Sequence, residues 1–290
     1  DEALRIRREE QLPVFEKLRD VRQRAITVGK IADIYQARGE LDEALRIRRK
    51  EQLPVFEKLR DVRSRAITIG KIADIYQVRG ELDEALRIRR EEQLPVFEKL
   101  RDVRQRAITI GKIADIYQVR GELDEALRIR REEQLPVFEK LRDVRQRAIT
   151  VGKIADIYQA RGELDEALAL HDERLPIAER LGDIEGVAHI RYSRASIRLQ
   201  RGDHQQGGLQ DIYEDLATAF DISRRLGRSD AIGAIRGLLA QVPFMDGLNG
   251  EAITAWHRLG DATGLALMAT LCDMARSQEK DIPFPPTAAP

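Results

Sequence analysis

The sequence predicts an all-α fold, a right-handed α-solenoid of antiparallel helix-turn-helix repeats. Two observations lead to this prediction. The phrase DEALRIRR begins at Asp1, Asp42, Asp83 and Asp124, and a diverged fifth copy begins at Asp165, so the chain repeats every 41 residues. Within each period, apolar residues recur at three- and four-residue spacing, as they do on one face of a helix. A fixed period of this length is typical of solenoids, in which each unit buries its apolar face against its neighbours.

The first helix of the repeat is expected over residues 24–38. Its apolar stripe consists of Ala25, Val28, Ile31, Ala32, Ile34 and Tyr35. Asp20, followed three residues later by Gln23, can cap the start of the helix with its side-chain oxygen. Gly39 can adopt the left-handed conformation that ends a helix.

The second helix is expected to run from Leu41 to Leu59, after a short turn that makes it the antiparallel neighbour of the first. Pro54 interrupts it, and a proline inside a helix costs about 3 kcal/mol because it removes a hydrogen bond and clashes with a carbonyl. The same proline recurs as Pro13, Pro95, Pro136 and Pro176. The fold must therefore accommodate it, by a kink or by a break into a short third helix.

The fifth copy has one residue fewer between Ala167 and Leu181 than earlier copies have between Ala44 and Leu59. One extra residue near a proline predicts a π-bulge in the earlier copies, which would relieve the proline clash and rotate the end of the helix. The junction that follows also differs. The fifth copy has Gly182 there, whereas the earlier copies have Arg19, Arg60, Arg101 and Arg142, although glycine is best suited to a left-handed helix end.

The repeat resembles the tetratricopeptide repeat. Val28, Ile31, Ala32, Tyr35, Gly39, Leu41 and Ala44 stand where that motif places Trp, Leu, Gly, Tyr, Gly, Tyr and Ala. Arg48 and Glu51 depart from its later aromatic and alanine positions. The long period and the Leu-Gly-Asp junction of the fifth copy resemble the arrays of Partner of Inscuteable adaptors and of bacterial signalling ATPases. The resemblance implies a non-catalytic protein that binds peptides or partner helices in a concave groove lined by the first helices.

Each first helix carries a polar strip of one lysine, one aspartate and one glutamine. The strip residues are Lys30, Asp33 and Gln36; Lys71, Asp74 and Gln77; Lys112, Asp115 and Gln118; and Lys153, Asp156 and Gln159. A solvated face is the simpler interpretation, with a Lys–Asp pair worth about 0.2–0.5 kcal/mol. The resemblance implies instead a partner-binding strip, because the aspartate replaces a ligand-gripping Asn of the family. Aspartate would favour a basic segment, and the preceding glycine, Gly29 in the first full copy, would leave room for its close approach.

The composition argues against several classes of function. Lys plus Arg and Asp plus Glu are 50 each, so no overall field attracts nucleic acid or a membrane. Recurrent arginines such as Arg46 and Arg48 could follow a phosphate backbone, but interleaved acidic residues and an aromatic content of 5% argue against nucleic-acid binding. No apolar run is long enough to span a bilayer, and Cys272 has no disulfide partner, so we expect a cytoplasmic protein.

Nothing in the sequence predicts catalysis. The histidines share no metal-ligand spacing, and HExxH, P-loop and GxGxxG motifs are absent. Surface or cap positions are the simpler interpretation for all four of them, His171, His189, His204 and His257. We therefore expect no enzyme, no cofactor and no metal site.

The repeat pattern suggests three segments. Residues 1–203 are expected to form a tetratricopeptide-like array of 41-residue repeats, residues 204–275 degenerate repeats that form a C-terminal cap containing Trp256, and residues 276–290 a flexible proline-rich tail. Asp1 falls in the middle of a repeat, so we expect the chain to be a fragment of a longer protein.

Two functions from different classes fit these expectations. The array is either a partner-recognition scaffold or sensor arm, with an effector domain before Asp1, or a structural element that self-assembles, for example as a homodimer. Self-assembly is considered because identical repeats offer identical surfaces that can dock in register. Near identity among the copies also has a neutral explanation, which is recent duplication or consensus design.

Overall fold

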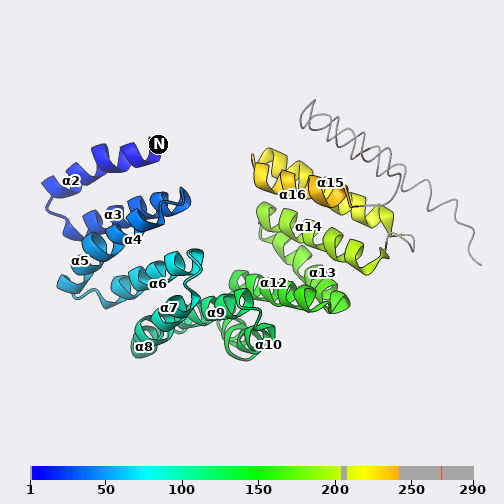
Figure 1. The fold of residues 1–290 in the computed structure, drawn as a ribbon, viewed down its shortest axis with the longest axis horizontal. Coiled ribbons are helices and arrows are strands. Elements are labelled where there is room, and N and C mark those ends of the chain that lie inside the picture. Colours follow the sequence, from blue (N-terminus) through cyan, green and yellow to red (C-terminus); the bar gives the residue numbers. More distant parts are fainter. Residues whose placement is uncertain (1, 204–207, 242–268, 270–290) are drawn as a thin grey trace, which may run out of the picture. The chain divides into compact units, whose positions relative to one another are not determined.

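The computed structural model describes residues 2–203, 208–241 and 269, and all regular structure in these ranges is helical (Figure 1). The chain forms two compact units, Asp1–Val144 and Arg145–Pro290. Consecutive helices pack in antiparallel pairs, as the repeat predicted. The expected tail (276–290) and most of the expected cap lie outside the described residues, and so do His204, Trp256, His257 and Cys272.

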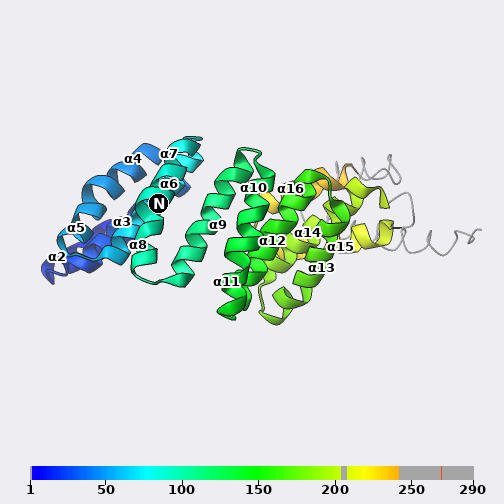
Figure 2. The same cartoon turned by 90° about the horizontal axis from the view of Figure 1, so that it is seen from below.

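In the first unit, each repeat contributes one uninterrupted helix and a second helix in three consecutive parts, of which the middle one is π-helical. Figure 2 shows the helices of this unit side by side. The uninterrupted helices are α3 (Val21–Ala37), α6 (Val62–Val78) and α9 (Val103–Val119). The second helices are α4 (Leu41–Ile47), η2 (Arg48–Gln52) and α5 (Leu53–Lys58); α7 (Leu82–Arg87), η3 (Ile88–Gln93) and α8 (Leu94–Lys99); and α10 (Leu123–Arg128), η4 (Ile129–Gln134) and α11 (Leu135–Lys140). A further second helix, α1 (Glu2–Arg5), η1 (Ile6–Gln11) and α2 (Leu12–Lys17), precedes them.

The predicted helix ends are confirmed. The Asp20 carboxylate accepts a hydrogen bond from the backbone N–H of Gln23 at 2.9 Å, and Asp61 and Asp102 cap the next two first helices in the same way. Gly39 has a φ of +78° after the end of α3. Arg60 also lies in the left-handed region, with a φ of 53°, where a residue with a Cβ atom is strained.

The predicted π-bulge is confirmed in all four early copies, where η1 to η4 are π-helical segments directly before the proline-containing turn. The second helix therefore continues through Pro54 without a break, since α4, η2 and α5 follow one another without a gap. The fifth copy forms one continuous α-helix, α13 (Leu164–Arg180), with Pro176 inside it. Because the proline is common to all copies and the π turn is not, the extra residue causes the π turn.

The repeats of the first unit are joined by an apolar core and by polar contacts between neighbours. Ile69 of α6 and Ile88 of η3 share a core with Leu45 of the preceding repeat and Ile116 of the next. Between repeats, Arg49 Nη2 donates to the hydroxyl of Tyr76 at 2.7 Å with its guanidinium 5.4 Å from the ring centroid. Each unit thus buries its apolar face against the next, as a solenoid requires.

The second unit contains α12 (Val144–Arg161), α13, α14 (Ile184–Arg201), α15 (Leu209–Arg225) and α16 (Ser229–Leu239). Successive helices from α13 onward pack against one another. The expected boundary at residue 203 falls in the turn between α14 and α15. These two helices share a core that includes Ala195, Tyr213 and Phe220, so this turn joins two halves of one hairpin. No helix in the described part of the chain is long and apolar enough to cross a membrane.

Candidate partner-binding groove

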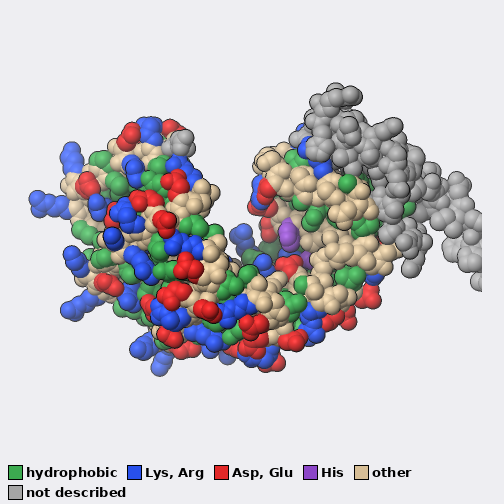
Figure 3. All heavy atoms as spheres, viewed as in Figure 1, with side chains coloured by type: hydrophobic (Ala, Val, Ile, Leu, Met, Phe, Trp, Pro, Cys, Tyr) green, Lys and Arg blue, Asp and Glu red, His purple; other side chains and the backbone are tan. Residues whose placement is uncertain are grey.

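The predicted polar strip lies on α3, α6, α9 and α12. Its lysines are exposed, its glutamines are half-buried, and its aspartates are half-buried except Asp33, which is exposed. Over the face of the first unit drawn in Figure 3, positive and negative side chains are interspersed. On α6, α9 and α12 the strip therefore faces solvent through its lysine more than through its aspartate, whereas on α3 both residues are exposed.

The strip aspartates are bound within their own repeat. Arg48 Nη2 donates to Asp33 Oδ1 at 2.6 Å. The same contact joins Arg89 to Asp74 at 2.5 Å and Arg130 to Asp115 at 2.6 Å. Only 2% of the Arg48 side chain is exposed, and burial lowers the pKa of its guanidinium while the Asp33 carboxylate opposes this effect. A buried cation needs such a partner, so the aspartate is a structural counter-ion.

A glutamine completes each buried polar cluster. Arg48 Nη1 donates to Gln52 Oε1 at 3.1 Å, and Gln52 is itself buried. A Cβ atom at Gly29 would overlap the Gln52 amide. The Gln52 side chain of the second helix thus fills the space directly over Gly29, and Gly29 also lines a pocket between α3 and α6. That a ligand approaches Gly29 there remains a prediction.

The buried arginine belongs to the π-helical part of the second helix, since Arg48 and Gln52 are the first and last residues of η2. The continuous α13 of the fifth copy has neither residue at these places. Its buried positions there are His171 and, over Gly152, the partly buried guanidinium of Arg174. The Arg-Gln pair thus occurs with the extra residue and is absent from the copy that lacks it.

A pocket of about 250 Å³ lies between α3 and α6, the first helices of two successive repeats. The strip residues Lys30, Asp33 and Lys71 line it, with Ile26 and Ile67 contributing apolar surface. Lys71 Nζ lies 3.5 Å from Asp33 Oδ1 of the preceding repeat. The structure therefore brings strip residues of neighbouring repeats together in one groove.

The predicted Lys–Asp pair within one helix forms on two of the helices. Lys112 Nζ lies 3.9 Å from Asp115, and also 3.9 Å from Asp74 of the preceding repeat. Lys153 Nζ lies 3.8 Å from Asp156. Exposed pairs at these distances are weak, so the lysines keep most of their freedom.

His171 contradicts its expected surface or cap position, because its side chain is fully buried. Burial and the positive charge of Arg174 lower its pKa to about 3, and the Arg174 guanidinium lies 3.3 Å from its Nδ1. This histidine occupies the place that a buried arginine takes in the earlier copies. It is therefore neutral in the folded protein and belongs to the packing of the repeat.

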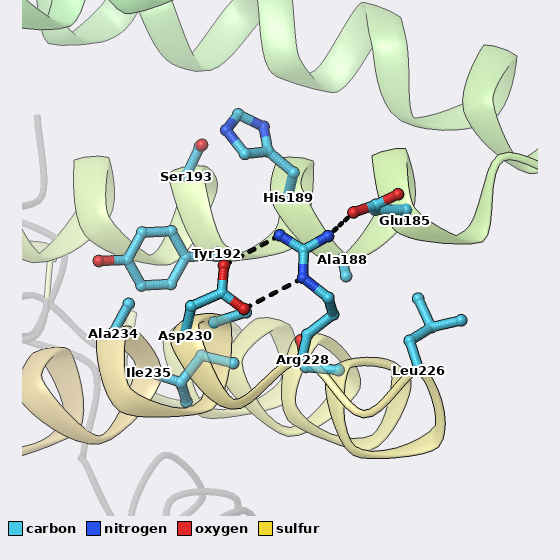
Figure 4. A pocket seen from close by; sticks show the side chains of 12 residues that line it. Glu185, Ala188, His189, Tyr192, Ser193, Leu226, Arg228, Asp230, Ala234 and Ile235 are labelled. Atoms are coloured by element: carbon cyan, nitrogen blue, oxygen red, sulfur yellow. Dashed lines mark hydrogen bonds and ion pairs between the residues drawn. The ribbon is translucent and has the colours of Figure 1, made fainter. Parts of the chain in front are cut away.

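A second pocket, of about 320 Å³, lies between α14 and α16 in the second unit (Figure 4). Tyr192 and His189 line it from α14, and Ile235 lines it from α16. Arg228 closes one side by pairing with Glu185 and with Asp230, whose Oδ2 lies 2.9 Å from Arg228 Nη2. Sequence reasoning missed this pocket because its residues come from segments without a regular period.

Neither pocket contains a metal-binding cluster. Among the described residues, no three His, Cys, Asp or Glu side chains are grouped so that they could hold a metal ion. The polar groups of the first pocket recur in each repeat, whereas a catalytic group needs one special environment. The geometry suits binding.

The comparisons with known proteins agree with the fold. A family model described as tetratricopeptide repeat matches residues 150–185, which include α13 and its junction. The matched segment belongs to the copy without the extra residue. No curated protein matches the chain.

Three solved structures are similar in fold. BtubC (BKLC) from P. vanneervenii has a TM-score of 0.60 and 18% identity over 78% of this chain and 90% of that chain. A putative kinesin light chain with nearly identical TPR-like repeats from Podosopora anserina has a TM-score of 0.52 and 22% identity over 71% and 98%. Aspartyl phosphate phosphatase F from Bacillus subtilis has a TM-score of 0.63 and 11% identity over 91% and 74%. At these identities the similarity concerns the fold alone.

Proposed function

Because the chain is a repeat protein of the tetratricopeptide type, we propose that it is a non-catalytic scaffold that binds a peptide or protein in the groove along α3, α6 and α9. Repeat proteins of this type generally mediate protein–protein interactions. The observation that carries the proposal is the pocket between α3 and α6, because strip residues of two repeats line it together. Exposed Ile67 adds apolar surface, and apolar surface with a few polar groups is what peptide side chains need.

The buried polar clusters support this function by holding the groove in one shape. Arg48 fixes the second helix to the first by donating to Asp33 at 2.6 Å, and it also donates to Gln52 of its own helix at 3.1 Å. A groove that is already formed loses less entropy when a peptide binds. The next repeat has the same residue types at Arg89, Asp74 and Gln93, so a partner would meet the same groove again.

A groove-filling variant tests the proposal. A library of random peptides is selected on the wild-type chain, and binding of the selected peptides is measured to the double variant Ile67→Trp and Ile108→Trp. Both isoleucines lie on the strip face of their helices. We expect the selected peptides to lose binding to this variant, because the indole rings occupy the groove.

The matched control is the double variant Val62→Trp and Val103→Trp, in which the same change is made at the starts of α6 and α9, where the valines are 48% and 49% exposed and, at about 3.6 residues per turn, lie on a different side of the helix from the strip. We expect this control to bind the peptides like the wild type. Equal binding to both variants would show that the groove is not the binding surface.

Self-assembly remains a second candidate, since one observation favours it. The junction between repeats exposes one leucine and one valine in each copy, such as Leu59 at 44% and Val62 at 48%. Such a row, repeated at a fixed interval, could pair with the same row of a second chain. Light scattering across concentration separates the two functions, because a dimer that grows with concentration supports self-assembly and a monomer that captures peptides supports the scaffold.

We also propose a cytoplasmic location, on the ground that Cys272 is the only cysteine in the sequence and that reducing compartments favour chains without disulfides. A role in signalling is proposed from the family resemblance. Cell fractionation with an antibody to the chain tests the location, and recovery in a secreted fraction would refute it.

A further inference from the structure

We propose that the segment bound in this groove is acidic and extended, with its acidic side chains about three residues apart. The inference rests on the proposed function and specifies the chemistry of the partner. It reverses the preference for a basic segment expected from the strip aspartates, because the structure gives those aspartates another task.

The strip carboxylates already have cationic partners in the chain. Asp33, Asp74 and Asp115 each accept a hydrogen bond from a guanidinium that is 2% exposed. The lysine of the next repeat also lies near two of them, with Lys71 Nζ 3.5 Å from Asp33 Oδ1 and Lys112 Nζ 3.9 Å from Asp74 Oδ1. A basic group of a partner would have to compete with both cations, so it gains little from these carboxylates.

The charged residues that line the pocket between α3 and α6 are Lys30, Lys71 and Arg48, against the single carboxylate of Asp33. The positive charge of Arg48 balances the negative charge of Asp33, so the positive charges of the two lysines remain at the rim of the pocket. Lys71 and Lys112 are 45% and 46% exposed, so their ammonium groups can reach a ligand. An acidic segment complements this rim in charge.

The strip lysines recur once per repeat, on first helices that lie side by side, since Lys71 Nζ of α6 is 3.5 Å from Asp33 Oδ1 of α3 and Lys112 Nζ of α9 is 3.9 Å from Asp74 Oδ1 of α6. Neighbouring helices typically lie about 8–10 Å apart. An extended chain rises about 3.3 Å per residue, so about three residues of a peptide span the distance from one helix to the next. Acidic side chains at every third position would then meet Lys30, Lys71 and Lys112 in turn.

The test uses the full chain and labelled peptides of about twelve residues, a length that spans three helices at the rise of an extended strand. One peptide repeats Glu-Thr-Val. A second has the same composition with its glutamates gathered at one end, and a third repeats Lys-Thr-Val. Fluorescence anisotropy measures their affinity at low and high salt.

We expect the Glu-Thr-Val peptide to bind more tightly than the other two, and its affinity to fall as salt rises. The triple variant Lys30→Gln, Lys71→Gln and Lys112→Gln should bind the Glu-Thr-Val peptide about tenfold more weakly or worse, because three complementary charges are lost. Glutamine keeps the helix and adds no repulsion toward Asp33, and circular dichroism checks that the helical content is unchanged.

The matched control neutralises one lysine per second helix, in the triple variant Lys17→Gln, Lys58→Gln and Lys99→Gln. These lysines are exposed near the ends of α2, α5 and α8, so the net charge changes equally without touching the strip. We expect this control to bind like the wild type. Equal weakening in both variants would overturn the inference, because it would report net charge alone.

Two further outcomes would also overturn the inference: tighter binding of the Lys-Thr-Val peptide, and equally tight binding of a thymidine oligonucleotide of similar length. Failure of the acidic-partner inference can be distinguished from failure of the proposed function. Library peptides that bind in the groove but are neutral or basic refute only the acidic partner. Library peptides that ignore the groove-filling variant refute the function as well.

Discussion

Replacing Asp74 by asparagine tests whether the strip aspartate is a structural counter-ion. Arg89 Nη2 donates to Asp74 Oδ1 at 2.5 Å, and Arg89 Nη1 donates to Gln93 Oε1 at 3.0 Å. The Arg89 side chain is 2% exposed and that of Asp74 is 25% exposed. Asparagine keeps the size and one oxygen acceptor but removes the negative charge. The change therefore isolates the charge that balances the buried guanidinium.

The expected cost follows from this geometry. Removing one partner of a fully buried ion pair costs about 3–5 kcal/mol. Solvent reaches Asp74 and screens part of the interaction, and the remaining amide oxygen still accepts a hydrogen bond. We therefore expect Asp74→Asn to reduce the local stability of the repeat by about 2–3 kcal/mol.

Hydrogen exchange measured by mass spectrometry over α6, η3 and α8 reports the free energy of local opening. A double-mutant cycle with Arg89→Met separates the pair from other effects, and the double variant should recover part of the loss because it leaves no buried charge. Asp83→Asn is the control, since the Asp83 side chain is 98% exposed beside Arg120. If Asp74→Asn lowers the free energy of local opening by less than about 0.5 kcal/mol and shows no coupling to Arg89, the counter-ion role is refuted. The aspartate would then again be a candidate for ligand binding.

Two other variants test the packing. Arg60→Gly should raise the free energy of unfolding by about 0.5–1 kcal/mol, because relief of about 1–2 kcal/mol of left-handed strain exceeds the added chain entropy of glycine. A lower thermal midpoint would contradict this. Gly182→Arg, at a φ of 65°, should lower the free energy of unfolding. His171 has an ordinary pKa of 6.5 and a folded pKa of about 3. Below pH 6.5 only the unfolded chain protonates it, so stability falls as pH falls, by about 2 kcal/mol at pH 5. Urea titrations give the free energy of unfolding at pH 7 and at pH 5. The drop between the two pH values should be about 2 kcal/mol smaller in His171→Leu than in the wild type. An equal drop in both proteins would count against the burial effect.

The sequence predicted the helical hairpins, their caps and the π turn because these features depend on residues near one another in the chain. Asp20 caps α3 from the adjacent position, and Gly39 ends it. The π turn followed from a count of residues, since one more residue between the same two anchors must be absorbed in the helix. The choice between a kink and a break at Pro54 could not be made from the proline, because Pro176 fits inside a continuous helix.

The buried arginine was not predicted, although one signal was present. Arg48 stood out as a departure from the tetratricopeptide pattern, but its charge suggested a surface position, as for most arginines. Its partner Asp33 lies fifteen residues earlier, and a pair between helices has no local signature. The signal was that Arg48, Gln52 and the extra residue occur together in four copies and are all missing from the fifth.

The extra residue in the second helix changes the chemistry of the first helix. In the copies that have it, a guanidinium is buried beneath the strip and the aspartate becomes its counter-ion. In the fifth copy, Arg174 fills the space over Gly152 without a π turn. Burial lowers the pKa of its guanidinium, and the negative charge of Asp156 opposes this effect. The strip looks the same on all four helices in the sequence, yet its aspartates do not share one environment. Under the proposal of an acidic partner, the lysines that the buried pairs leave at the rim would select that partner, and the second helix would determine which charges remain there.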